Sequence, residues 1–225
     1  MFNSLQLNLG NNKYHNVSHQ LNMAKTDWSW AGLIFDYNLD GNEDIFVTNG
    51  YRKYGSDNDS RIKINQTKIE YNNRVPIEMK KRLYNELPSE KLSNLLYKNE
   101  GNLIFNEVGE QSNILEPSFS NGAAYADLDN DGDLEIIVNN IDDNAFIYKN
   151  LSVENNLGNF LKVELKGNLS ENFAKGTIYF ENSSKIKESK RVRGYLSSVT
   201  DELHFGCLLY TSDAADEGLG VDLGG

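Results

Sequence analysis

An internal repeat constrains this chain more than any other feature of its sequence. Two acidic segments, DYNLDGNED at residues 36–44 and DLDNDGDLE at residues 127–135, lie 91 positions apart. A shared register over about 45 positions indicates duplication of one structural unit, because a chance match of two acidic turns would not extend into the flanking sequence. The same offset aligns these further pairs: Asn8 with Asn99, Gly10 with Gly101, Tyr14 with Phe105, Val17 with Val108, Val47 with Val138 and Asn49 with Asn140.

Short runs of β-branched and aromatic residues flank each acidic segment. WAGLIFDY and NGAAYADL precede the two segments, and DIFVTNG and LEIIVNN follow them. Such runs, bounded by Gly, Asn and Asp, are typical of strands. LLYKNEGNLIFNEVG at 95–109 predicts a hairpin around a Gly-Asn turn, and AFIYKN at 145–150 predicts the start of the next one. LQLNLGNNKYHNVS near the N-terminus predicts the same hairpin of an earlier unit, so we expect the chain to begin inside a repeat.

A polar, charged insertion at about residues 51–94 lengthens the first unit and is missing from the second. Its second half, PIEMKKRLYNELPSEKLSN, predicts one or two short helices interrupted by Pro88. Insertions on one face of a repeat fold are often binding elements, and a solvated lid without a partner is equally consistent with this composition.

Four-stranded units that repeat along a chain are typical of β-propeller blades. We therefore predict a mainly all-β fold: a partial β-propeller of four-stranded blades over residues 1–150, with the helical insertion, followed by a small β-rich domain over residues 155–206. Fewer than three blades are present. Each blade buries its faces against its neighbours, so we expect a fragment of this size to be marginally stable alone.

Both acidic segments follow the pattern D-x-[DN]-x-D-G-x-x-[DE], which indicates a cation-binding loop. Positions 1, 3 and 5 of a tightly curled loop direct short oxygen-bearing side chains inward, and Gly at position 6 permits the sharp turn. Position 7 can supply a backbone carbonyl and position 9 a carboxylate. Such oxygen ligands in a flexible loop favour Ca²⁺ over Mg²⁺. We predict two calcium sites, with the ligands Asp36, Asn38, Asp40, Asn42 and Asp44 in the first and Asp127, Asp129, Asp131, Asp133 and Glu135 in the second.

Two other interpretations of the loops are weaker. An EF-hand needs a Glu at position 12 and flanking helices, whereas Val47 and Val138 occupy that position between predicted strands. Asp-rich turns also form without a metal, because Asp and Asn bond their own backbone. Because two such loops occur in matching register, with Gly at the same position, a turn without a metal is the weaker explanation. At positions 1, 3, 5 and 9 the second loop supplies four side-chain carboxylates, whereas the first supplies three and the amide of Asn38, so we predict tighter binding at the second.

The stretches FDYNLDGNEDIFVTNG and YADLDNDGDLEIIVNN resemble the FG-GAP or VCBS repeats of integrin-α-type propellers. The resemblance covers residues 1 to about 150. It implies Ca²⁺ held at the blade loops and an extracellular or cell-surface location, usually for adhesion or ligand binding.

The stretch after residue 155 resembles the ASPIC/UnbV domain that follows such repeats in bacterial surface proteins. The resemblance rests on these residues: FLKVELKGN at 160–168, Gly176, Arg193, Gly194, Tyr195, Ser197, Ser198 and LHFG at 203–206. The combination implies a bacterial, secreted or surface-exposed protein. The match ends at Gly206, where that family continues HFGLG. Residues 207–225 resemble a translated sequencing adapter instead, and we expect a non-native tail there.

The net charge of −11 argues against a nucleic acid partner, and no apolar run is long enough for membrane insertion. No catalytic constellation stands out, so we predict a non-enzymatic calcium-binding module for an unknown protein or glycan ligand. The alternatives are a polysaccharide-processing enzyme, whose cleft Trp28, Trp30 and the insertion would line, and a structural spacer. For the two tryptophans, burial between blades is the favoured prediction over a sugar-stacking platform. A structural role is favoured for His204.

Overall fold

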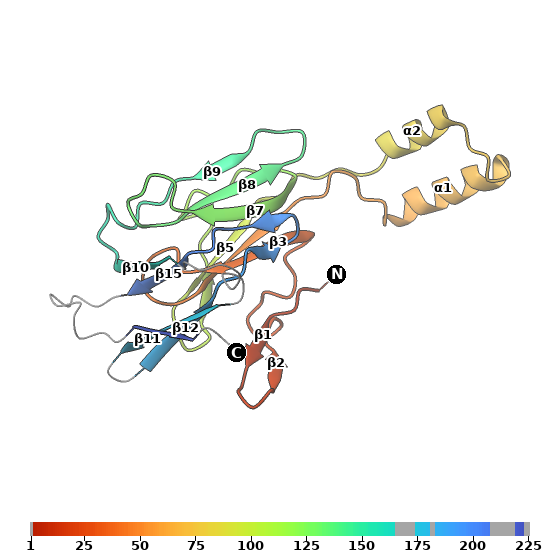
Figure 1. Cartoon of the computed structure of the whole chain (residues 1–225). Coiled ribbons are helices and arrows are strands. Elements are labelled where there is room, and N and C mark those ends of the chain that lie inside the picture. The colour runs from red at the N-terminus through yellow and green to blue at the C-terminus, as the bar shows by residue number, and fades with distance from the viewer. Residues whose placement is uncertain (1, 165–173, 181–182, 208–218, 223–225) are drawn as a thin grey trace.

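The computed structural model describes residues 2–164, 174–180, 183–207 and 219–222 of the 225-residue chain. The described chain is mainly β, with several small antiparallel sheets and two helices (Figure 1). The predicted β class with a helical insertion is confirmed at this level, and among the described strands the sheets do not close into a propeller ring. No helix in the described part of the chain is long and apolar enough to cross a membrane.

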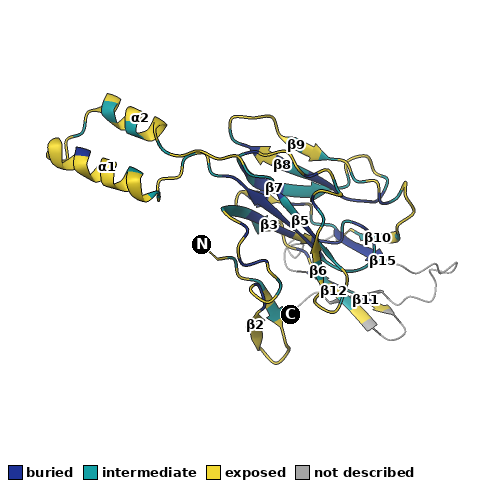
Figure 2. Cartoon of the chain, turned by 180° about the vertical axis from the view of Figure 1, so that it is seen from behind, coloured by how far each residue is buried: buried dark blue, intermediate teal, exposed yellow. Residues whose placement is uncertain are grey.

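Two antiparallel sheets form the centre of the molecule. Their inner faces are buried (Figure 2) and share one core, in which the rings of Phe35 and Tyr125 stack with centroids 4.7 Å apart. Apolar residues from both sheets fill this core, so neither sheet buries its apolar face alone. The first sheet has the strand order β3 (Ser29–Phe35), β4 (Asp44–Asn49), β5 (Leu95–Asn99) and β6 (Phe105–Glu107), and the second has β7 (Ser120–Ala126), β8 (Glu135–Asn140) and β9 (Phe146–Tyr148).

The strand registers confirm the duplication. Phe35 pairs with Asp44 in the first sheet, and Ala126 pairs with Glu135 in the second, 91 positions later in both strands. The same irregularity interrupts both pairings, between Ser29 and Gly32 and between Ser120 and Ala123. The N-terminal hairpin of β1 (Gln6–Asn8) and β2 (Tyr14–Asn16) has the register of β5 and β6, with Gln6 opposite Asn16 where Tyr97 lies opposite Glu107.

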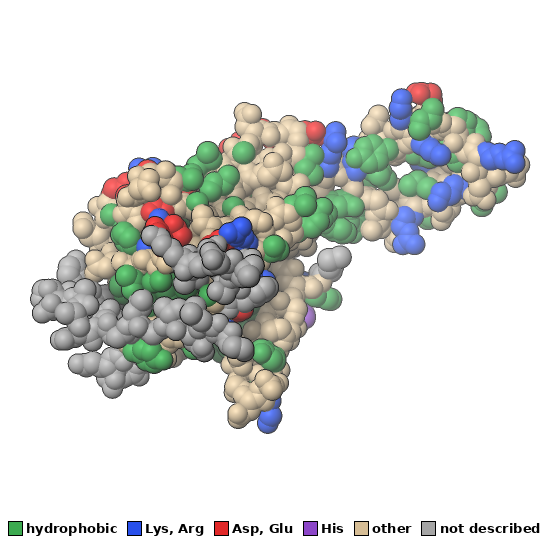
Figure 3. Space-filling model, viewed as in Figure 1, with side chains coloured by type: hydrophobic (Ala, Val, Ile, Leu, Met, Phe, Trp, Pro, Cys, Tyr) green, Lys and Arg blue, Asp and Glu red, His purple; other side chains and the backbone are tan. Residues whose placement is uncertain are grey.

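The insertion forms an arm that projects away from the sheets (Figure 1). It contains α1 (Asn58–Glu70) and α2 (Ile77–Asn85), whose residues are mostly exposed (Figure 2) and which carry many Lys and Arg side chains (Figure 3). The prediction of a short helix before Pro88 is confirmed by α2. Sequence reasoning missed α1, because its apolar residues follow no single stripe. Its N-terminal cap was the available signal: the Asp57 side chain accepts a hydrogen bond from Ser60 N at 2.8 Å.

The C-terminal part of the chain is built from short strands that lie against the two central sheets. Its own small core contains Ile178, Leu203 and Phe205. Residues 165–168 of the ASPIC/UnbV-like stretch lie outside the described residues, as do 208–218 and 223–225 of the tail, whose origin stays a prediction. The strands are β10 (Asn159–Val163) paired with β15 (Leu203–Cys207), β11 (Lys175–Phe180) between β12 (Ser183–Glu188) and β16 (Leu219–Asp222), and β13 (Val192–Gly194) paired with β14 (Ser197–Ser198).

Candidate metal centre

Each acidic segment is the loop between the first two strands of a sheet. The first joins β3 to β4, and the second joins β7 to β8. Gly41 and Gly132, at position 6 of the loops, have φ angles of 86° and 105°. This left-handed region is unfavourable for any side chain with a Cβ atom, so both loops require the glycine that the motif provides.

The second loop brings its acidic side chains into two groups that can hold metal ions. In one group, carboxylate oxygens of Asp127, Asp129 and Glu135 lie within 4.8 Å of one another. The other group joins Asp131 and Asp133 to Glu154 at the same limit. Every residue predicted for the second site therefore belongs to one of these groups. Glu154 lies outside the motif, after β9, and sequence spacing gave no signal for it.

The three carboxylates predicted as ligands in the first loop, those of Asp36, Asp40 and Asp44, do not form such a group. They accept backbone hydrogen bonds instead: Asp36 Oδ2 from Gly41 N at 2.7 Å, and Asp40 Oδ1 from Asn42 N at 2.8 Å. Asn38 donates its amide to Asp40 Oδ2 at 2.9 Å. The second loop has an equivalent bond, from Asp133 N to Asp131 Oδ1 at 3.1 Å, and differs in that its carboxylates also lie in two close groups.

The carboxylate at position 9 ties each loop to its sheet. Asp44 accepts hydrogen bonds from Tyr37 N at 3.2 Å and from Asn99 N, at the end of β5, at 2.7 Å. In the second loop Glu135 accepts from Leu128 N at 2.8 Å and from Asn150 N at 3.3 Å. Both oxygens of each carboxylate thus fix the loop ends, a role that the motif alone did not indicate.

Three carboxylate oxygens at predicted ligand positions are buried without a hydrogen-bond partner among the described residues. They are Asp36 Oδ1, Asp127 Oδ1 and Asp133 Oδ1. Asp36 and Asp127 both occupy position 1 of their loops, so the equivalent oxygen lacks a hydrogen-bond partner in both repeats. A buried charged oxygen without a partner is costly. A hard cation is the ligand that fits these oxygens, because it removes that cost.

Burial also shifts the ionisation of these groups. It raises the pKa of Asp36 to about 6, that of Asp133 to about 6 and that of Asp44 to about 8, against the opposing effect of the backbone N–H donors. Neighbouring carboxylates add to each increase. A bound divalent cation would favour the charged form and lower these pKa values.

Lysine side chains partly neutralise the second loop. Lys149 Nζ lies 3.1 Å from Asp129 Oδ2 and 3.1 Å from Glu154 Oε1, and so connects the two acidic groups. This contact holds the pKa of Asp129 below its ordinary value. Lys162 Nζ lies 3.8 Å from Asp127 Oδ2. The ion pairs of Lys149 are exposed and contribute little to stability, so a divalent cation can displace its ammonium group.

The C-terminal strand β15 covers both loops. His204 Nε2 lies 2.7 Å from the carbonyl oxygen of Gly132, and burial lowers the pKa of this imidazole. Gly206 lies so close to the first loop that an added Cβ would clash with the Asp36 carboxylate. The LHFG residues that carried the C-terminal resemblance therefore contact the acidic loops. His204 is buried there, and its structural role stays a prediction.

A second polar connection joins the two loops to each other. The Asn150 side-chain amide donates to Tyr37 O at 2.7 Å and to Leu134 O at 3.2 Å. Tyr37 belongs to the first loop and Leu134 to the second, so one side chain fixes their spacing.

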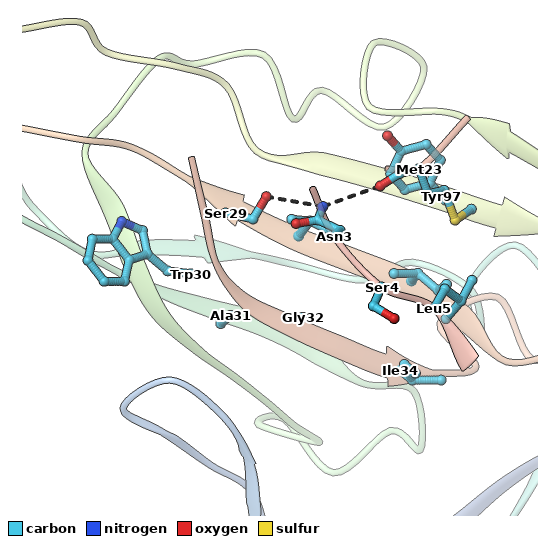
Figure 4. A pocket seen from close by; sticks show the side chains of 12 residues that line it. Asn3, Ser4, Leu5, Met23, Ser29, Trp30, Ala31, Gly32, Ile34 and Tyr97 are labelled. Atoms are coloured by element: carbon cyan, nitrogen blue, oxygen red, sulfur yellow. Dashed lines mark hydrogen bonds between the residues drawn. The ribbon is translucent and has the colours of Figure 1, made fainter. Parts of the chain in front are cut away.

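The two tryptophans lie beside surface cavities and are half-buried. Trp30 lines a pocket of about 300 Å³ between the N-terminal segment and β3 (Figure 4), and its indole donates to Gly50 O at 2.6 Å. Trp28 lines a separate hollow of about 870 Å³ at the base of the arm. Both indoles are thus only partly buried, and their burial between blades stays a prediction.

No model of a known protein family matches the sequence, and no curated protein is significantly similar to it.

Proposed function

We propose that the protein is a calcium-binding β-propeller module of the FG-GAP/VCBS type. The observation that carries the proposal is the set of buried oxygens of Asp36, Asp127 and Asp133, which have no hydrogen-bond partner in the described chain and occupy ligand positions of a duplicated motif. In a metal-free loop these atoms destabilise the fold. With a cation they hold both loops in place.

The second loop is the stronger of the two sites. Its carboxylates already lie in two close groups, whereas those of the first loop do not. Glu154 adds a carboxylate from outside the motif. Ca²⁺ would supply positive charge, and the chain's own residues would orient the ligand oxygens: Gly41 and Gly132 by their left-handed turns, and Asn150 by its bonds to both loops.

We infer that the two central sheets are neighbouring blades of a partial propeller, and that β1 and β2 belong to a further blade. The matching registers and the shared core support this arrangement. The C-terminal strands would form the ASPIC/UnbV-like domain, with β15 as a cover over the calcium loops.

In this proposal the module acts outside the cell or on its surface, as a non-enzymatic binder of a protein or glycan. The acidic composition favours that class of partner over nucleic acids. With calcium bound, the acidic side chains of both loops would be occupied by metal and backbone contacts, which supports a binding role over catalysis.

Thermal unfolding in calcium and in chelator tests the proposal. We expect calcium at about 100 times its Kd to stabilise the fold by about 2.7 kcal/mol, roughly 5–11 °C for a chain of this size. Asp131→Ala should reduce this gain more than Asp40→Ala, and the exposed Glu110→Gln should leave it unchanged. Native mass spectrometry should find two bound ions. An identical melt in calcium and chelator would rule the proposal out.

A further inference from the structure

A wide hollow lies where the arm leaves the first sheet. Its volume is about 870 Å³, within the range of ligand sites. Its walls come from the turn before β3, from both ends of the insertion and from the start of β5. On the face shown in Figure 3, hydrophobic side chains gather at the base of the arm. The insertion thus converts one end of the sheet into a concave surface.

Three aromatic rings form one wall of this hollow. The Trp28 ring lies 4.2 Å from that of Tyr51 and 5.9 Å from that of Tyr54, between centroids. Tyr54 is 41% exposed. Because the rings support one another, a ligand that stacks on them orders few side chains, which lowers the entropic cost of binding. The wall is therefore preorganised.

The repeat fold itself does not require these aromatic residues. In the second unit Phe119 stands in the place of Trp28, and Asp142 stands in the place of Tyr51. Strands β7 and β8 nevertheless pair in the same register as β3 and β4. Packing of the repeat is thus not sufficient to explain the aromatic wall, which belongs to the unit that carries the arm.

Polar groups beside the rings are available for a ligand. Asp27 and Glu90 are exposed and line the hollow, and their carboxylates make no hydrogen bond or ion pair with the described residues. The indole N–H of Trp28 has no acceptor in the described chain either, in contrast to that of Trp30, which bonds to Gly50. One cation, Lys25, also lines the hollow, and its Nζ lies over the Phe2 ring at 5.7 Å from the centroid. Two carboxylates against one ammonium group leave the hollow net negative, which disfavours an anionic ligand.

We propose that this hollow binds a segment of a neutral polysaccharide. The C–H faces of a sugar ring stack on aromatic side chains, and its hydroxyl groups bond to carboxylates and to an indole N–H. The inference rests on the proposed surface-binding function and names its ligand class and site. It assigns stacking to Trp28 and Tyr54, and hydroxyl recognition to Asp27 and Glu90.

Affinity electrophoresis of the full chain in calcium tests the site. The gels contain laminarin, xyloglucan, galactomannan or hydroxyethyl cellulose, and a further gel contains the anionic polygalacturonate. We expect at least one neutral polysaccharide to retard the protein and polygalacturonate not to do so. Trp28→Ala and Tyr54→Ala should each weaken the retardation at least about tenfold, since each removes a stacking surface. Tyr14→Ala is the matched control, because Tyr14 is also an exposed tyrosine, at 62%, but lies in β2 away from the hollow.

Three outcomes would overturn the inference: no retardation in any neutral gel, retardation by polygalacturonate alone, or equal weakening by Tyr14→Ala. Melting curves of every variant show whether it is folded, and the Tyr54 variant decides the matter where Trp28→Ala does not fold. The same curves with and without calcium separate the two proposals. A calcium-dependent melt without retardation rejects the glycan site alone, and retardation that depends on Tyr54 without a calcium effect rejects the calcium proposal alone.

Discussion

Replacement of Asp36 by asparagine gives opposite effects with and without calcium. Burial raises the pKa of Asp36 to about 6 from its ordinary value of 3.8. The stability that this carboxyl contributes is fully present below pH 3.8 and is lost as the pH rises through about 6. At pH 8 the charged Asp36 therefore destabilises the metal-free protein. The asparagine side chain carries no charge, and its oxygen can still accept the hydrogen bond from Gly41 N.

The size of the effect follows from the pKa shift. Roughly two pKa units correspond to about 3 kcal/mol at pH 8. The amide nitrogen that replaces Oδ1 remains without a partner and offsets about 1 kcal/mol of this gain. We expect Asp36→Asn to stabilise the chelated protein by about 2 kcal/mol, or roughly 4–8 °C in melting temperature.

Thermal unfolding by circular dichroism at pH 5 and pH 8, in chelator and in calcium, measures the effect. In chelator at pH 8 the variant should melt above the wild type, and the difference should shrink at pH 5. In calcium the order should reverse, because the variant has lost a charged ligand. Glu110→Gln, an exposed carboxyl outside the loops, should change neither. A variant that melts below the wild type in chelator at pH 8 would refute the reasoning.

Three further predictions concern the same loops and the hollow. In chelator, the wild-type melting temperature should fall as the pH rises from 5 to 9, because the buried Asp44 has a pKa raised to about 8, and saturating calcium should flatten this profile. A flat profile in chelator would contradict it. Gly206→Ala should destabilise the fold by about 1–3 kcal/mol, since its Cβ would clash with Asp36, whereas Gly55→Ala has open space and should be near neutral on melting. Incubation with the polysaccharide that retards the protein should release no reducing ends, and their time-dependent appearance would favour the enzymatic alternative.

The duplicated architecture was predictable because equivalent residues recur at a fixed offset of 91 positions. Residues that pair across β3 and β4 recur 91 positions later in β7 and β8, so the register could be read without knowledge of any tertiary contact. The alternation of apolar and polar residues on either side of the Gly-Asn turn predicted the hairpins. The arm was predictable only in part, because α1 is stabilised by local capping at Asp57 and has no apolar stripe to reveal it.

The motif identified five of the six carboxylates in the two acidic groups of the second loop, but not the contacts that these carboxylates make. The motif identified Asp44 and Glu135, yet their hydrogen-bond partners Asn99 and Asn150 come from the ends of later strands. The position of Glu154 beside Asp131 depends on how the chain turns after β9. The spacing of side chains within a loop indicates which oxygens can bind one cation. The N–H groups that bond to the same oxygens belong to distant parts of the chain, so no local sequence pattern reveals them.

These long-range contacts connect the two loops to each other and to the C-terminal strand β15. Asn150 fixes the spacing between the loops, His204 lies against the second, and Gly206 packs against the first. A cation that draws Asp36 into a new position must therefore displace strand β15 or act against its packing. Conversely, a cover that excludes water from the loops raises the cost of their bare carboxylates and so strengthens their preference for a cation. The same burial that makes the metal-free loops unfavourable is thus the source of the affinity proposed for them.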